Sequence, residues 1–229
     1  MELTITKIIQ ETSKISRFFF KNQDSDTIQF EAGQFIMLKH PNWLDSADSR
    51  SYSLANENTV VKELEICVVL NEMGMFTPWL FSLEVGATIQ SSAPVGSFIF
   101  KEDEHAGPDV FICTGTGIAP FRSMITKALN LNREVHLVFG NRYLNDVPYH
   151  EYWLELAQKN SFFHYYPVFS REEFTQYKGY VHPVYEAILQ GQSDPRIYVC
   201  GWQEMCIEAR ERLKKMGFNR RQYFFEQYN

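Results

Sequence analysis

The sequence Cys113-Thr114-Gly115-Thr116-Gly117-Ile118-Ala119-Pro120 decides the fold of the second half of this chain. It follows the apolar run Val110–Cys113 and precedes a helical pattern that continues through Asn130. Glycines let the backbone approach a diphosphate closely, and the N-terminus of the following helix adds amide donors and positive potential. Pro120 stands where the usual dinucleotide fingerprint has its third glycine, so the position of the loop between strand and helix carries the prediction of dinucleotide binding. The alternative is a plain turn.

The chain beyond this loop alternates between apolar strands and helical segments. The alternation follows a charged stretch with glycine and proline, Lys101–Pro108, which indicates a domain boundary. Such alternation is typical of a doubly wound α/β fold with a parallel sheet. The expected strands are Val110–Cys113, Val135–Phe139, Phe163–Phe169, Arg196–Cys200 and Gln222–Tyr228, and the expected helices run through Asn130 and cover His150–Ala157, Val184–Leu189 and Gln203–Met216.

The chain before the boundary contains short strands separated by turns, a pattern that predicts a small antiparallel β-barrel. One helix interrupts it, with Thr77 expected at the N-cap and Pro78 at the first helical position. The N-terminus of this helix either binds a diphosphate or belongs to a simple capped helix that closes the barrel. The expected strands are Leu3–Gln10, Ile15–Phe20, Glu31–Leu38, the strand with Arg50, Lys62–Leu70, Thr88–Gln90 and Gly96–Phe100.

The run Arg50-Ser51-Tyr52-Ser53 combines a cation, an aromatic ring and hydroxyl groups. On a strand, Arg50 and Tyr52 share one face, and Ser51 and Ser53 share the other. A guanidinium suits a diphosphate, a tyrosine ring suits a planar heterocycle, and a short hydroxyl suits a ring nitrogen. An ordinary edge strand with a surface arginine is the alternative interpretation.

Composition and charge exclude several classes of protein. Apolar residues make up 45% and charged residues 22% of the 229 residues, as in soluble globular proteins. The net charge of −6 argues against nucleic acid as a partner. The four cysteines are not spaced as metal or iron–sulfur ligands, so no metal site is expected. Without a leader or a long apolar run, we expect a cytoplasmic protein that does not insert into membranes.

Five motifs occur in an order that resembles the ferredoxin–NADP reductase superfamily, and the resemblance covers essentially the whole chain. Its closest motifs are those of the ferredoxin/flavodoxin–NADP reductases. The resemblance implies an FAD-binding β-barrel domain at residues 1–103 and an NAD(P)-binding domain at residues 104–229, whose C-terminal tail contacts the flavin. The motifs are Gly33-Gln34-Phe35, Arg50–Ser53, Gly74–Thr77, Thr114–Pro120 and Cys200-Gly201 with Met205.

For FAD, the resemblance implies that Arg50 pairs with the diphosphate, that Tyr52 lies on the isoalloxazine and that Ser53 sits near its N5 atom. Ser51 belongs to the same motif. The backbone around Cys67 and Val68 would face the ribityl chain. The segment Gly74, Met75, Phe76 and Thr77 would close on the diphosphate.

For the pyridine nucleotide, the resemblance implies that the loop of Thr114, Gly115, Thr116, Gly117 and Pro120 holds the diphosphate. Cys200 and Gly201 would lie beside the nicotinamide. Met205 belongs to the same motif and is also expected to bind the cofactor. Cys200 taken alone would be a small buried hydrophobic residue. Trp202-Gln203 follows where many relatives have prolines, which is a departure from the family pattern.

The C-terminal sequence Phe224-Phe225-Glu226-Gln227-Tyr228-Asn229 resembles the ending of plant-type reductases, in which a glutamate precedes a terminal tyrosine that stacks on the flavin. The resemblance then implies a catalytic set of Ser53, Cys200, Glu226 and Tyr228. Asn229 extends one residue beyond that pattern. The alternative for this segment is a final strand that ends in an exposed tyrosine.

The resemblance favours NADP over NAD. Ser170 and Arg171 resemble the pair that binds the 2′-phosphate in plant-type reductases, and Lys178, Tyr180 and Arg142 are further candidates. Gly179-Tyr180-Val181-His182 also resembles NADH-using oxygenase reductases, and Glu172 and Glu173 dilute the positive field, so NAD stays possible.

The function implied is a flavin-dependent oxidoreductase that passes electrons between NAD(P)H and a one-electron carrier such as ferredoxin or flavodoxin. Two enzymatic alternatives are an NADH-dependent reductase component of an oxygenase and a free-flavin reductase. A third alternative is a regulatory or assembly subunit that keeps the flavin-binding fold without catalysis.

Overall fold

The computed structural model describes residues 1–41, 49–173 and 176–228. Backbone proximity divides the chain into two compact units. Unit 1 comprises Met1–Phe100 with Ala119–Met124, and unit 2 comprises Lys101–Ile118 with Ile125–Asn229.

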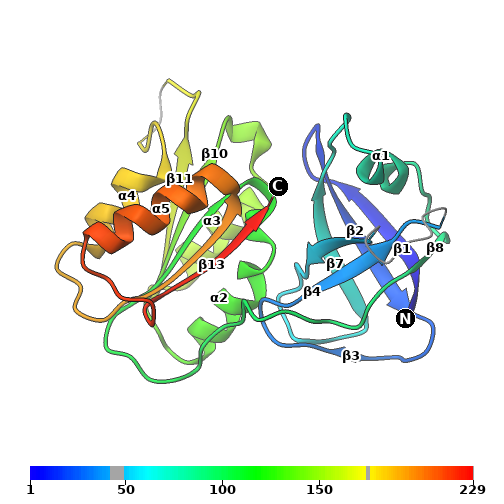
Figure 1. Ribbon diagram of the computed structural model, residues 1–229, viewed down its shortest axis with the longest axis horizontal. Helices are drawn as coiled ribbons and strands as arrows, with labels where there is room; N and C mark the ends of the chain where they lie inside the picture. The colour runs from blue at the N-terminus through cyan, green and yellow to red at the C-terminus, as the bar shows by residue number, and fades with distance from the viewer. Residues whose placement is uncertain (42–48, 174–175, 229) are drawn as a thin grey trace. The chain divides into compact units, whose positions relative to one another are not determined.

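Unit 1 is built from antiparallel strands (Figure 1). The larger sheet has the order β7-β2-β1-β8, and two-stranded sheets pair β4 with β5 and β3 with β6. Isolated bridges connect Leu38 of β4 to Ser91 and Leu54 to Ile66 of β7, so hydrogen bonds link β4 and β5 to both ends of the larger sheet. The strands are β1 Glu2–Gln10, β2 Ile15–Asn22, β3 Ile28–Gln29, β4 Phe35–Lys39, β5 Ser49–Ser53, β6 Val60–Val61, β7 Glu63–Val69 and β8 Thr88–Gln90.

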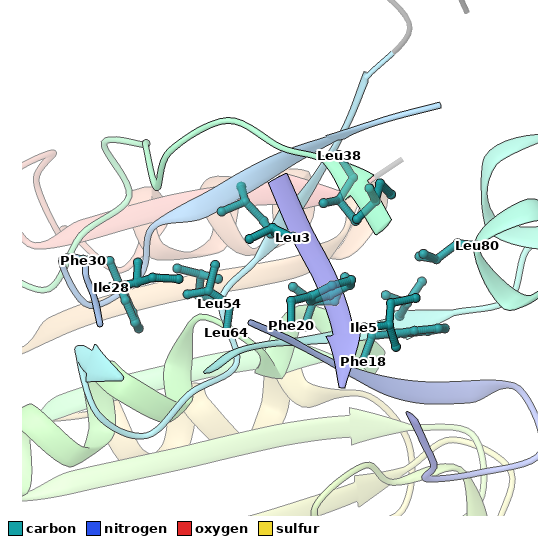
Figure 2. Close-up of a cluster of buried hydrophobic side chains, with 14 of the residues drawn as sticks. Leu3, Ile5, Phe18, Phe20, Ile28, Phe30, Leu38, Leu54, Leu64 and Leu80 are labelled. Carbon is teal, nitrogen blue, oxygen red and sulfur yellow. The ribbon is translucent and has the colours of Figure 1, made fainter. Parts of the chain in front are cut away.

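The core of unit 1 forms where inward-facing side chains of these strands meet. Figure 2 shows Leu3 and Ile5 of β1 beside Phe18 and Phe20 of β2, and each is at most 1% exposed. Burying a side chain of this size stabilises a fold by about 1.5–3 kcal/mol. Leu80, from the short helix α1 (Phe76–Phe81), packs into the same cluster.

The prediction of a strand at Gly96–Phe100 is wrong. The segment runs as irregular chain, and Gly96 has a φ of +129°, which a regular strand does not adopt. Phe98 and Phe100 are both 7% exposed, and the Phe100 amide donates to the Ala32 carbonyl. The apolar alternation that predicted a strand therefore reflects burial of two aromatic rings by a loop.

Unit 2 confirms the expected parallel sheet. Its five strands lie in the order β11-β10-β9-β12-β13, and each neighbouring pair is parallel. The strands are β9 Asp109–Thr114, β10 Val135–Asn141, β11 Phe163–Phe169, β12 Arg196–Trp202 and β13 Tyr223–Tyr228.

Helices cover both faces of this sheet, which is why β9 and β10 are apolar on both sides. Helices α4 (Val181–Leu189) and α5 (Gln203–Lys215) pack on one face, in a cluster with Val110, Val138 and Ile197. Helices α2 (Phe121–Asn130) and α3 (His150–Lys159) lie on the other face (Figure 1). The usual right-handed connection between parallel strands accounts for this arrangement, because the strand order runs outward from β9 to β11 and then returns to β12.

No helix among the described residues is both long and apolar enough to cross a membrane.

Candidate functional site

The carboxyl ends of β9 and β12 form the centre of the site in unit 2. The strand order reverses at β9, and in doubly wound sheets ligands bind outside the strand ends at such a reversal. A Cβ at Gly117 would clash with the Cys200 carbonyl, and one at Gly201 would clash with the Thr114 side chain. The Trp202 amide donates to Thr114 Oγ1 over 3.1 Å. The predicted loop and Cys200-Gly201 therefore lie in direct contact, and both need glycine.

The loop itself departs from a simple turn. Gly115–Ile118 forms a short 3₁₀ helix, η2, and Gly115 has a φ of +53°. A Cβ at Gly115 would meet no atom within 4 Å, so the backbone there is bare toward open space. Pro120 is buried and precedes α2 directly.

Cys200, Glu226 and Tyr228 come together in unit 2. Cys200 and Glu226 are partners in the register of β12 and β13, as are Trp202 and Tyr228. Burial raises the pKa of the Cys200 thiol well above its usual value, and the nearby Glu226 carboxylate raises it further, whereas a hydrogen bond with Tyr228 lowers it. Cys200 is therefore a neutral thiol near pH 7, suited to packing against a ring and not to nucleophilic attack.

The residues predicted to select NADP also gather at one edge of the sheet. Ser170 donates its amide to the Asn141 carbonyl over 3.0 Å, and Arg171 donates its amide to the Arg142 carbonyl over 3.0 Å. Lys178 is bridged to Phe169, the last residue of β11. Exposed Tyr180 directly precedes α4. Three cations and two hydroxyls, those of Ser170 and Tyr180, thus share the carboxyl ends of β10 and β11.

Glu172 is a local counter-charge to this cluster. Its carboxylate accepts a hydrogen bond from the Leu144 amide over 3.0 Å, at the start of the 3₁₀ helix η3 (Leu144–Asp146). The structure therefore gives Glu172 a role in holding the neighbouring loop.

Sequence reasoning missed Asn141, which ends β10 in the same region. Its Nδ2 atom is buried and has no hydrogen-bond partner among the described residues. A buried amide donor without a partner is costly, so this atom fits an acceptor supplied by a ligand. The only signal in the sequence is a polar residue at the end of an apolar strand, directly before Arg142.

In unit 1, strand β5 positions the Arg50–Ser53 motif as predicted for a strand. Arg50 is exposed, Tyr52 is half-buried and Ser53 is 5% exposed. The rings of Tyr52 and Phe76 lie with centroids 5.8 Å apart, so two of the predicted residues meet. Burial raises the pKa of the Tyr52 hydroxyl, and the Arg50 charge opposes this, so Tyr52 is neutral at any ordinary pH.

The other residues predicted to bind the cofactors range from exposed to buried. Ser51 is exposed on β5 and Met75 is 73% exposed. Cys67 and Val68 are buried in β7, and Met205 belongs to the hydrophobic cluster of unit 2 at 8% exposure.

The prediction that Thr77 caps α1 is wrong. The helix begins at Phe76 with Met75 at the N-cap position, so Thr77 lies inside the first turn. Thr77 Oγ1 accepts from the Asn71 amide over 2.9 Å and donates to the Asn71 carbonyl over 3.0 Å. The hydroxyl closes the loop that holds Gly74 instead of satisfying the helix end.

The sequence analysis also did not predict a buried cluster of ion pairs in unit 1. Arg122 Nη1 lies 3.0 Å from Glu65 Oε2 and donates to the Ala55 carbonyl over 2.8 Å, while its Nη2 lies 2.5 Å from Glu57. Arg17 also pairs with Glu65, over 2.7 Å. The available signal was Glu65 within the apolar strand Leu64–Val69.

The residues present fit both implied cofactors. In unit 2, the bare backbone at Gly115 suits a diphosphate. The buried Asn141 amide, which has no hydrogen-bond partner in the described part of the chain, suits a polar nucleotide group. In unit 1, a guanidinium beside a half-buried neutral tyrosine suits a ligand with a diphosphate and a flat ring.

Comparison with known families agrees with this assignment. Residues 2–100 match the oxidoreductase FAD-binding domain, and residues 111–211 match the oxidoreductase NAD-binding domain. The chain belongs to the ferredoxin–NADP reductase superfamily, and it is an FAD- and NAD(P)-dependent oxidoreductase.

Two relatives and one solved structure illustrate the range of the family. The chain is 29% identical to ferredoxin–NADP reductase B of Sorangium cellulosum, over 92% of this chain and 90% of that protein. It is 31% identical to the reductase component of phenol 2-monooxygenase from Pseudomonas sp. strain CF600, over 87% of this chain but only 58% of that protein. The crystal structure of the Amycolatopsis cytochrome P450 reductase GcoB aligns with a TM-score of 0.87 at 27% identity, over 99% of this chain and 69% of that one.

Proposed function

We propose that this protein passes electrons between NADPH and a one-electron carrier protein such as ferredoxin or flavodoxin. The observation that carries the proposal is the convergence of Glu226 and Tyr228 on Cys200, whose carbonyl lies against Gly117. The similarity to a ferredoxin–NADP reductase along nearly its whole length supports it. The two domains would be residues 1–103 and 104–229, and the protein would act in the cytoplasm.

When bound, FAD supplies the exchange between two-electron hydride chemistry and single electrons. Arg50 would bind its diphosphate, Tyr52 would orient its ring system and Ser53 would donate a hydrogen bond to it. In unit 2, Thr114–Gly117 would bind the nucleotide diphosphate. Cys200 would exclude water from the nicotinamide side, and Glu226 would hold and release a proton.

Anaerobic rapid mixing of the FAD-loaded protein with NADPH or NADH tests the proposal. We expect faster bleaching of the flavin by NADPH, followed by transfer to ferredoxin or flavodoxin. Faster bleaching by NADH would instead support the second candidate, an oxygenase reductase, which the similarity to the phenol monooxygenase component favours. A protein that retains no flavin but reduces added FAD would be a free-flavin reductase, and one that neither nucleotide reduces would contradict the enzyme proposal.

The preference for NADPH can be tested separately at the cation cluster of β10 and β11. Replacing Arg171 or Arg142 by glutamine should weaken NADP⁺ binding about tenfold, because each change removes one charge-assisted contact to the 2′-phosphate. Binding of NAD⁺ should not change. The control Arg220→Gln alters an exposed cation outside this cluster and should leave both affinities unchanged. Equal losses for NADP⁺ and NAD⁺ would contradict the assignment.

A further inference from the structure

Glu134, His136 and His164 form a cluster at the beginning of β10 and β11. His136 and His164 are register partners on the two parallel strands, and their rings are stacked with centroids 4.7 Å apart. Glu134 Oε1 lies 3.3 Å from Nε2 of His136 and 3.4 Å from Nε2 of His164. The three potential ligand atoms all lie within 4.8 Å of one another.

We propose that this cluster binds a divalent transition-metal ion of the zinc class, with both histidines and Glu134 as ligands. Two imidazoles and one carboxylate make a donor set that Zn²⁺ accepts, with a fourth position left for water. In a tetrahedral site with bonds of about 2.0–2.1 Å, ligand atoms lie about 3.3–3.4 Å apart. The two distances from Glu134 match this spacing, and both exceed the usual range for a strong hydrogen bond.

Tyr166 gives the cluster a second feature of metal sites. Its hydroxyl lies 3.1 Å from Nδ1 of His136, on the side of the ring away from Glu134. Metal-bound histidines almost always donate their second ring N–H to a fixed acceptor, which sets the tautomer and the ring orientation. With Nδ1–H donating to Tyr166, the Nε2 lone pair of His136 points to the proposed metal position.

Exposure permits a metal ion to enter. The His136 side chain is 10% exposed, whereas those of His164 and Glu134 are 40% and 53% exposed. One ligand is thus anchored in the fold and two face solvent. His136 lies near the start of β10, six residues before Arg142, and six residues correspond to about 20 Å along a strand. The metal would therefore fasten the edge strand β11 to β10 and take no part in hydride transfer.

Zinc titration of the tag-free, FAD-loaded protein after chelator treatment tests this proposal. Calorimetry should show one saturable site per chain, Co²⁺ should give the visible spectrum of a tetrahedral site, and Zn²⁺ should raise the Tm. Glu134→Gln and His164→Gln should weaken binding by at least about tenfold, and Tyr166→Phe should weaken it by about tenfold.

The matched control is Glu155→Gln, which makes the same change at an exposed glutamate that pairs with Lys159 in α3. It should bind zinc like the wild type, and metal-free melting curves should show that all variants fold. Absence of saturable binding would overturn the proposal. So would wild-type affinity in both Glu134→Gln and His164→Gln, because zinc would then bind elsewhere.

Discussion

Two constraints act on Gly201, a positive φ angle and a lack of room for a Cβ, whereas Gly191 has the positive φ angle alone. Gly201 has a φ of +139° and no room for a Cβ beside Thr114, whereas Gly191 has a φ of +83° and open space around it. Both alanine variants incur backbone strain, but only Gly201→Ala adds a clash, which should cost about 1–3 kcal/mol more in the free energy of unfolding. Urea unfolding measures the difference, and NADP⁺ affinity should fall only in Gly201→Ala. Equal effects of the two substitutions would show that packing against Thr114 is unimportant.

Tyr228 is proposed to cover the flavin and to move aside when nicotinamide approaches. Deleting Tyr228 and Asn229, of which Asn229 lies outside the described residues, should strengthen NAD(P)⁺ binding and reduce the preference for NADPH. Tyr228→Phe is the control, because it retains the ring and removes only the hydroxyl that bonds to Cys200. Titration of each variant with NADP⁺ and NAD⁺ measures both effects, and unchanged discrimination in the deletion would exclude the covering role.

The first turn of α2 depends on its buried charge. Arg122→Met should lower the free energy of unfolding by about 3 kcal/mol, because it removes a buried cationic partner of Glu65, which also pairs with Arg17. Lys127→Met is the control on the same helix, since Lys127 pairs with Glu102 in an exposed position and should contribute less than about 1 kcal/mol. Urea unfolding compares them, and equal losses would show that burial of the Arg122 pair has no special weight.

Elements whose pattern depends on local chemistry were predictable from sequence. The parallel strands of unit 2 are apolar runs between glycines and helices, and they occur where expected. The cap at Thr77 was wrong because its hydroxyl bonds to Asn71, six residues earlier. The strand at Gly96–Phe100 was wrong because aromatic burial without a ladder produces the same alternation. In both cases a competing contact decided the structure.

Across the whole molecule, the interactions missed by sequence reasoning join residues far apart in the chain. Arg122 meets Glu65 across 57 positions, and His136 meets His164 only through the register of β10 and β11. The Cys200–Glu226 pair was found because a family motif identified each residue. Where no motif existed, as for His164, spacing along the sequence contained no signal that the residue lies beside His136.

Unit 2 should lose stability in mild acid. Burial lowers the pKa of His136, His150 and His182 below the ordinary value of 6.5. The unfolded chain therefore takes up protons first, so this stability is complete above pH 6.5 and is lost as the pH falls toward the folded pKa values. Metal-free urea unfolding should show a lower midpoint at pH 5.5 than at pH 7.5, with a smaller difference in His182→Gln. An identical difference in that variant would exclude His182 as a source.

The reactivity of the four buried cysteines can be used to measure transient opening of the protein. All four cysteines are at most 5% exposed, with Cys67 in unit 1 and Cys113, Cys200 and Cys206 in unit 2. Alkylating reagents attack only exposed thiolates, so the native chain should resist them and modification should follow opening. Mass spectrometry of partially labelled protein would then measure the opening rate of each unit separately. The label on Cys67 reports on unit 1, and the labels on the other three cysteines report on unit 2.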